Sequence, residues 1–210
     1  MKQRARSTAL LAVALVLTVA LSLVACGKRD AIRETREILS DVDNFTFIYQ
    51  IDGRDQSQKI AIPYFLAVTA DAAREETVIG TTYATVSAAG ATIWRPFGDT
   101  YVPTNCSLAE YREQTRGADS YYGMFLSYLD PGDWKWERQR DAFVPRDYAM
   151  FAALGLEVTD MELTITDAGC NIMGQAVKTD GGARYEVIIT MSVTGLGSTE
   201  VTLPEGITAG

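Results

Sequence analysis

Apolar and polar side chains alternate along several segments of this 210-residue chain, and this pattern limits the fold more than any other feature. The alternation is clearest over residues 184–194, where Tyr185, Val187 and Ile189 share one face with Met191 and Val193. A period of two is that of a β-strand with one buried face. Strands are therefore predicted over residues 44–52, 57–66, 77–88, 91–96, 99–102, 161–166, 171–178, 184–194 and 199–203.

Turn and capping sequences indicate how these strands are connected. Asp52-Gly53 and residues 179–182 are hairpin signals, and a hairpin joins antiparallel strands. Ser107 and Glu110 form a capping box for a helix over 107–114, and Asp119 or Ser120 caps a second helix over 121–129. Shorter helices are predicted over residues 30–39, with Ile32, Ile38 and Leu39 on one face, and over 148–154. The fold class is α+β: a mainly antiparallel sheet of about seven to nine strands with helices packed on one face.

The first 26 residues carry the pattern of a secretory signal that ends in a lipobox. Lys2, Arg4 and Arg6 precede an apolar run, which ends in Leu23, Val24 and Ala25 before Cys26. The small Ala25 would give a peptidase access to the bond before Cys26, whose thiol is expected to carry a thioether-linked diacylglycerol. The alternatives are an ordinary secretory signal or an uncleaved anchor, and an apolar run of about 17 residues is at the short edge of a membrane span.

This pattern resembles that of bacterial lipoproteins and implies three parts. Residues 1–25 are a signal peptide that is removed, residues 26–30 are the lipidated cysteine and a short tether, and residues 31–210 are one domain. No repeat or linker divides that domain. The expected location is outside the cytoplasmic membrane, at the cell surface or in the periplasm, with the lipid as anchor.

The charge balance argues against nucleic acid as a partner. The whole chain has a formal net charge of −8, and without Lys2, Arg4 and Arg6 the remaining 16 basic and 27 acidic residues give −11. Nucleic-acid binding depends on neutralising phosphates with Lys and Arg, so it is disfavoured. An acidic protein is also not held on an anionic bilayer by charge alone, so the acyl chains would have to hold it there.

Cys106 and Cys170 remain once Cys26 is lipidated. In an oxidising compartment such a pair is predicted to form a disulfide. The alternative is two buried free thiols, because a free cysteine behaves as a small apolar residue.

The residue inventory argues against an enzyme. The chain has no histidine, which removes Ser-His-Asp and Cys-His catalysis and histidine-ligated zinc. The acidic pairs that remain are expected on solvated loops or helix faces: Glu75 and Glu76, Glu110 and Glu113, Asp130 and Asp133. We predict no catalytic residue, no metal site and no cofactor. A secreted hydrolase is the least favoured hypothesis for the function.

The aromatic residues suggest two different roles. Tyr121, Tyr122, Phe125 and Tyr128 fall on one helix face, which either covers the sheet as core or lines an apolar cavity between sheet and helices. Trp134 and Trp136 lie in a charged segment over 133–147 that is expected to be irregular. They are predicted to pack locally, to rim such a cavity or to contact a partner.

The order of elements resembles the LolA and LppX/LprG type of bacterial lipoprotein and lipid carrier. The resemblance rests on the lipobox, on the helix followed by residues 44–49, on Ile93-Trp94-Arg95, and on residues 184–194 followed by 200–204. It implies a curved half-barrel sheet that binds a lipid or a lipidated client without catalysis. No cavity residue can be carried over from the family.

We therefore expect a non-enzymatic, membrane-anchored lipoprotein that binds a lipid or another hydrophobic ligand between sheet and helices. The alternative is a protein-interaction or envelope-assembly module with a solid core, contacting an envelope protein through loops such as 133–147.

Overall fold

The computed structural model describes residues 27–53 and 61–207. The lipobox residues Leu23, Val24, Ala25 and Cys26 lie outside these residues, as do the rest of the signal segment and the predicted strand residues 57–60. Among the described residues, no helix is both long and apolar enough to cross a membrane.

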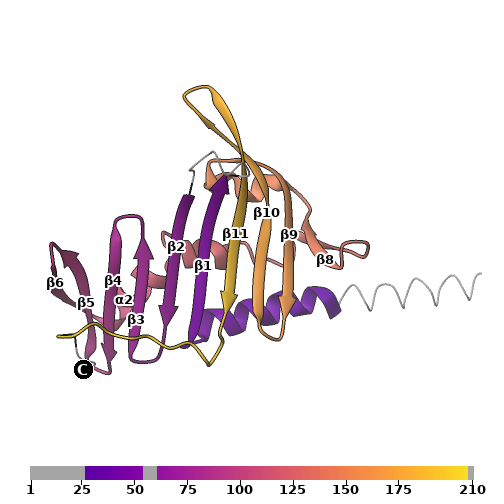
Figure 1. Cartoon of the computed structure of the whole chain (residues 1–210). Coiled ribbons are helices and arrows are strands. Elements are labelled where there is room, and N and C mark those ends of the chain that lie inside the picture. The colour runs from indigo at the N-terminus through magenta and orange to yellow at the C-terminus, as the bar shows by residue number, and fades with distance from the viewer. Residues whose placement is uncertain (1–26, 54–60, 208–210) are drawn as a thin grey trace, which may run out of the picture.

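Within the described residues, eleven strands form one open antiparallel sheet in the order β6-β5-β4-β3-β2-β1-β11-β10-β9-β8-β7 (Figure 1). The first six are β1 (Phe45–Gly53), β2 (Ala61–Val68), β3 (Ala72–Thr77), β4 (Gly80–Ser87), β5 (Gly90–Phe97) and β6 (Thr100–Cys106). The other five are β7 (Trp134–Glu137), β8 (Ala142–Pro145), β9 (Glu157–Thr166), β10 (Gly169–Asp180) and β11 (Ala183–Thr194).

The path of the chain explains why the helices cover the sheet. From β1 the chain moves strand by strand to the β6 edge, and β7 then begins at the opposite edge. Helices α2 (Leu108–Arg116) and α3 (Tyr121–Ser127) connect these edges across one face of the sheet (Figure 1). The chain then returns from β7 to β11, which pairs with β1 in the centre.

Two further helical segments pack on the same face. A helix over residues 27–41, called here the N-terminal helix, buries Ile32 and Leu39 completely or nearly so. The 3₁₀ helix η1 (Tyr148–Leu154) begins after the N-cap Asp147 and ends at Gly155, whose left-handed conformation suits glycine. The capping box of Ser107 and Glu110 and the N-cap Ser120 are present as predicted.

The central strands show why alternation was informative. Phe45, Phe47, Tyr49 and Ile51 on β1 are buried under the helices, whereas the residues between them are only partly buried. On β11, Val187, Ile189, Met191 and Val193 are buried on the same face. The sheet is therefore mainly antiparallel with helices on one face, as the sequence predicted.

Several detailed expectations were wrong. In the described part of the chain the sheet has 11 strands and not seven to nine, because residues 72–77 form β3 and the segment expected to be irregular contains the β7–β8 hairpin. Residues 199–203 are not a strand. Residues 27–30, predicted as a tether, already belong to the N-terminal helix, and Ile38 on that helix is 58% exposed. The sheet is open between its edges β6 and β7 and does not curl into a half-barrel (Figure 1).

The predicted disulfide between Cys106 and Cys170 is absent, and both thiols are free. Cys106 ends the edge strand β6, whereas Cys170 lies on β10, seven strands along the sheet. At the usual spacing of neighbouring strands this separation is roughly 30 Å, and bridged cysteines have Cα atoms within about 7 Å. Burial raises the pKa of the Cys170 thiol to about 12, so this residue behaves as a core side chain.

Candidate functional site

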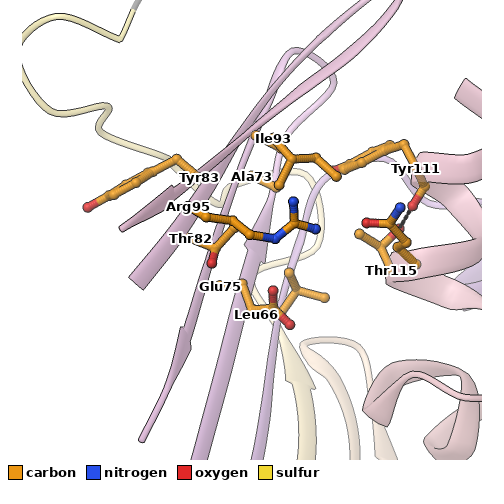
Figure 2. Close-up of a pocket in the computed structure, with 11 residues that line it drawn as sticks. Leu66, Ala73, Glu75, Thr82, Tyr83, Ile93, Arg95, Tyr111 and Thr115 are labelled. Carbon is orange, nitrogen blue, oxygen red and sulfur yellow. Dashed lines mark hydrogen bonds between the residues drawn. The ribbon is translucent and has the colours of Figure 1, made fainter. Parts of the chain in front are cut away.

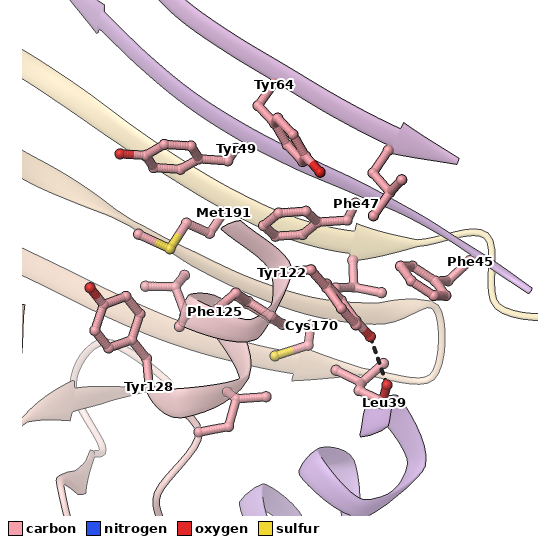
Figure 3. Packing of buried hydrophobic residues seen from close by; sticks show 14 of the residues in the cluster. Leu39, Phe45, Phe47, Tyr49, Tyr64, Tyr122, Phe125, Tyr128, Cys170 and Met191 are labelled. Atoms are coloured by element: carbon pink, nitrogen blue, oxygen red, sulfur yellow. Dashed lines mark hydrogen bonds between the residues drawn. The ribbon is translucent and has the colours of Figure 1, made fainter. Parts of the chain in front are cut away.

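Three of the four aromatic residues predicted on the α3 face are core residues. Tyr122 and Phe125 are fully buried and Tyr128 is 4% exposed (Figure 3). The Tyr122 ring stacks on Phe45 with centroids 4.5 Å apart, and Phe125 lies 5.3 Å from Phe47. These distances leave no space for a ligand between α3 and the centre of the sheet. Of the two roles considered for this helix face, these three residues therefore have the first: they cover the sheet as core and do not line a cavity.

Tyr121 is the exception, because it lies at the border of this core and lines an open cleft. Its side chain is 41% exposed, and its ring centroid lies 4.8 Å from that of Tyr49 and 4.7 Å from that of Tyr64. We call this cavity of about 300 Å³ the end cleft. Its lining residues are Tyr49, Ile51, Ile62, Tyr121, Met124, Ala153, Leu154, Gly155, Leu156 and Lys178.

Five parts of the chain build the end cleft, and one of them is β10, which contributes Lys178. Tyr49 and Ile51 come from β1 and Ile62 from β2, so one wall is sheet. Tyr121 and Met124 come from α3, and the segment around Gly155 supplies the end of η1 and the residues after it. The helix caps at Ser120 and Asp147 fix where α3 and η1 begin, and therefore place both walls relative to the sheet.

The chemistry of the end cleft is apolar with two polar features. The pKa of Tyr49 is raised to about 12, mainly by burial and to a smaller extent by the nearby Tyr121 and Tyr128. Its hydroxyl therefore stays protonated at neutral pH. Among the described residues that line the cleft, Lys178 on β10 is the only charged one, and no described acidic residue forms an ion pair with it. An aliphatic and aromatic wall beside one cation suits a small amphiphile with an anionic group.

A second cavity lies between α2 and strands β2–β5, but its volume is only about 80 Å³ (Figure 2). Figure 2 shows Glu75 and Arg95 on the strands and Tyr111 and Thr115 on α2 around this space. The Tyr111 hydroxyl is buried and has no hydrogen-bond partner among the described residues. Since one water occupies about 30 Å³ of liquid volume, the cavity suits two or three waters better than a ligand.

The two predicted contact tryptophans occupy different environments. Trp134 is fully buried, and its indole Nε1 donates a 2.7 Å hydrogen bond to the Tyr128 carbonyl oxygen. It therefore has no surface to offer to a ligand or partner. Trp136 is half-buried on β7, with its ring 5.0 Å from Phe143 and the Lys28 ammonium 3.8 Å from its centroid. Neither tryptophan lines the end cleft.

Two residues of the predicted acidic pairs, Glu110 and Glu76, are engaged in structural contacts. Glu110 accepts hydrogen bonds from the Ser107 backbone N–H and hydroxyl, and these bonds lower the pKa of its carboxyl. Glu76 forms an ion pair with Arg74, and Glu75 faces the small cavity beside α2. Among the described residues, no group of three or more acidic or cysteine side chains is arranged to hold a metal ion.

Sequence reasoning identified Tyr121 but missed Tyr49, Lys178 and the leucines at 154 and 156 as neighbours in one cleft. Tyr49 was predicted only as part of a strand over residues 44–52. Lys178 reaches the site because β10 pairs with β11, and β11 pairs with β1. Pairing of strands distant in sequence leaves no local signal in either strand.

No protein-family description matches this chain, and no curated protein is significantly similar to it.

Proposed function

We propose that this chain is a non-enzymatic, extracytoplasmic lipoprotein, anchored through Cys26, that binds a small hydrophobic or amphiphilic ligand in the end cleft. The observation that carries the binding proposal is the position of Lys178 beside the apolar wall of Tyr121, Met124 and Leu154. The anchor proposal rests on the lipobox alone.

The size of the cleft limits the ligand. A volume of about 300 Å³ is at the lower end for small-molecule sites and corresponds to roughly ten water-sized groups. The stacked core around Tyr122 and Phe125 prevents a chain from extending further under the sheet. A LolA-like carrier function therefore has to work here with a short or partly inserted acyl group, held in a shallow site on an open sheet.

Lys178 favours an anionic head group on the ligand. Its side chain is half-buried at the cleft, where a carboxylate or phosphate would gain a charge-assisted hydrogen bond. The protonated Tyr49 hydroxyl is a second donor at the same wall. A ligand with an acidic group and a short apolar tail matches both features.

A second candidate is a protein-interaction or envelope-assembly module, and the packed core favours it. Such a module needs no cavity, and the half-buried Trp136 at the β7–β8 hairpin is an aromatic side chain that a partner could contact. Trp136→Ala would then weaken capture of an envelope protein while the fold is retained. Trp134 cannot serve in this way, because it is fully buried.

Native mass spectrometry of residues 27–210, secreted from a bacterial host, tests the ligand proposal. We expect a bound mass that leaves on denaturation and is identified as an acidic amphiphile. Tyr121→Asp should abolish it, whereas Tyr148→Asp is a matched control, because Tyr148 is similarly exposed at 39% and lies outside the cleft. Lys178→Gln should weaken binding, whereas Lys135→Gln on the edge strand β7, outside the cleft, should not.

A bound mass that survives Tyr121→Asp would contradict the assignment to the end cleft. A wild-type protein without ligand that also fails to bind added short-chain fatty acids would favour the interaction module.

A further inference from the structure

We propose that the β7–β8 hairpin and the first turn of the N-terminal helix form a surface that lies on the head groups of an anionic lipid bilayer. We call this surface, which comprises residues 27–33 and 134–145, the membrane edge. The proposal rests on the lipid anchor at Cys26 proposed above, and it adds how the domain is oriented on the membrane.

The position of the anchor restricts the orientation. Cys26 directly precedes the N-terminal helix, and consecutive Cα atoms are about 3.8 Å apart. The first turn of this helix lies beside β8, at the opposite end of the sheet from β5 and β6 (Figure 1). The contact of Lys28 with Trp136, 3.8 Å from the ring centroid, confirms that the helix start and β7 are neighbours. A lipid on Cys26 would therefore place this edge next to the bilayer.

Trp136 and Lys28 are suited to the head-group region. Trp136 is half-buried, with one part of its ring against Phe143 and Lys28 over its face. Tryptophan is enriched at membrane interfaces, where an apolar ring and a polar N–H each find a partner. A lysine beside it can reach lipid phosphates while its methylene groups cover the ring.

The charge distribution also favours this edge. The membrane edge contains six of the 16 basic residues that follow Cys26 and three acidic residues, so its formal net charge is +3. The other parts of residues 27–210 therefore carry −14, which together with +3 gives the total of −11. Those parts are repelled by an anionic surface within a Debye length, whereas the membrane edge is not.

Several cations of the membrane edge are available to lipids. Arg29, Lys135 and Arg138 form no ion pair with a described acidic residue. Arg140, by contrast, is held at 2.7 Å from Asp160 and 3.0 Å from Glu162. The first three side chains can therefore contact lipid phosphates without breaking a contact of the fold.

The competing surface is the exposed apolar tip at the other end of the sheet. Val78 and Ile79 in the β3–β4 turn are 71% and 90% exposed, and Phe97 at the β5–β6 turn is 74% exposed. Trp94 on β5 is half-buried near this end. The fluorescence of Trp94 and that of Trp136 therefore report on opposite edges of the sheet. Trp134 is buried and contributes the same background emission in every variant.

The test uses the full chain, produced in a bacterial host and purified from its membranes. Intact mass first shows whether Cys26 carries lipid. The protein is then placed in bilayers of phosphatidylcholine and phosphatidylglycerol whose acyl chains are brominated near the head groups. Tryptophan emission is compared for wild type, Trp94→Phe and Trp136→Phe. We expect quenching in wild type and in Trp94→Phe, and its loss in Trp136→Phe.

Charge reversal at the membrane edge gives a second readout. The double variant Lys135→Glu and Arg138→Glu should reduce quenching in the anionic bilayer. The control double variant Arg95→Glu and Arg112→Glu, at exposed positions on β5 and α2, should leave it unchanged. Lipid on Cys26 with quenching that follows Trp94, or with no quenching, would overturn the orientation alone. A chain without lipid on Cys26 would overturn both the anchor and the orientation.

Discussion

The Tyr122 hydroxyl donates a 2.7 Å hydrogen bond to the backbone carbonyl oxygen of Leu39 (Figure 3). This bond joins α3 to the last turn of the N-terminal helix, whose carbonyl groups lack partners within the helix itself. Arg116 at the end of α2 donates to the Ser40 and Val42 carbonyl oxygens in the same turn. The N-terminal helix is therefore fixed at its C-terminal end by the two helices that cross the sheet.

Removing the hydroxyl should have opposite consequences at two tyrosines. Tyr122→Phe leaves the Leu39 carbonyl without this partner and should lower the free energy of unfolding by about 1–3 kcal/mol. The Tyr128 hydroxyl is buried without a hydrogen-bond partner among the described residues, so Tyr128→Phe should be neutral or stabilising by about 1 kcal/mol. Urea unfolding of both variants measures the difference. Equal losses at the two sites would show that the Leu39 bond contributes nothing specific.

The two tryptophans of strand β7 should differ in what they contribute. The fully buried Trp134 should matter for stability, and the half-buried Trp136 should matter for surface contacts. Trp134→Ala removes a fully buried side chain and should destabilise the protein by about 3–5 kcal/mol. Trp136→Ala loses a partly exposed contact with Lys28 and Phe143 and should cost about 1 kcal/mol. Thermal unfolding followed by circular dichroism compares them. The hairpin would be peripheral to the core if both variants melted like wild type.

Alkaline pH should destabilise the fold through Cys170. Burial raises the pKa of this thiol from 9.0 to about 12 in the folded state. The stabilisation is therefore fully present below pH 9 and is lost progressively as pH rises toward 12, because the unfolded chain releases the proton first. Cys170→Ala should flatten this part of the curve of unfolding free energy against pH, relative to wild type. An unchanged slope would assign the alkaline loss to the buried tyrosines alone.

Two glycines in hairpin turns should respond differently to alanine. A Cβ at Gly169 would overlap the Val193 carbonyl oxygen, and its φ is +150°, so Gly169→Ala should cost about 3 kcal/mol or more. Gly181, with φ +56°, has no atom near its Cβ position, and Gly181→Ala should cost about 1 kcal/mol. Chemical denaturation would rank them, and a larger loss at Gly181 would contradict the close approach of β10 to β11.

The anchor itself has a direct chemical test. Cys26→Ala should abolish metabolic labelling with a radioactive fatty acid and leave an unprocessed precursor of higher mass, because the thiol that accepts the lipid is gone. Cys106→Ala is the matched control and should be labelled and processed like wild type. Label that persists in Cys26→Ala would exclude a lipobox at this position.

The sequence predicted local structure well and long-range arrangement poorly, and the reason is physical. The capping residues Ser107 and Ser120 act on their own helix, so their motifs were readable. Strand β3, with the sequence AAREET, lacks strict apolar alternation and is defined by its neighbours β2 and β4, so it was missed. The sequence did not reveal the β7–β8 hairpin, because β7 lies in a charged segment and only its first residue, Trp134, is buried.

The candidate site shows the same division. Tyr121 was identified from a helix face, but the same reasoning grouped it with Tyr122, Phe125 and Tyr128, which are core. The helical period shows which residues lie on one side of the helix. It does not show how far along that side the helix packs against the sheet. Tyr121 lines a cleft because it lies at the border of that cover, and Lys178, which is distant in the sequence, lines the same cleft.

The strand order has a consequence for how the chain folds. Every described strand pair joins consecutive strands except β1 with β11, whose paired residues Thr46 and Thr194 are about 150 residues apart. Strands β1–β6 and β7–β11 are thus two local meanders, each able to form from short-range contacts. The transition state should then be governed by when the two halves meet, so mutations at the β1–β11 seam would slow folding, while mutations at either outer edge would mainly speed unfolding.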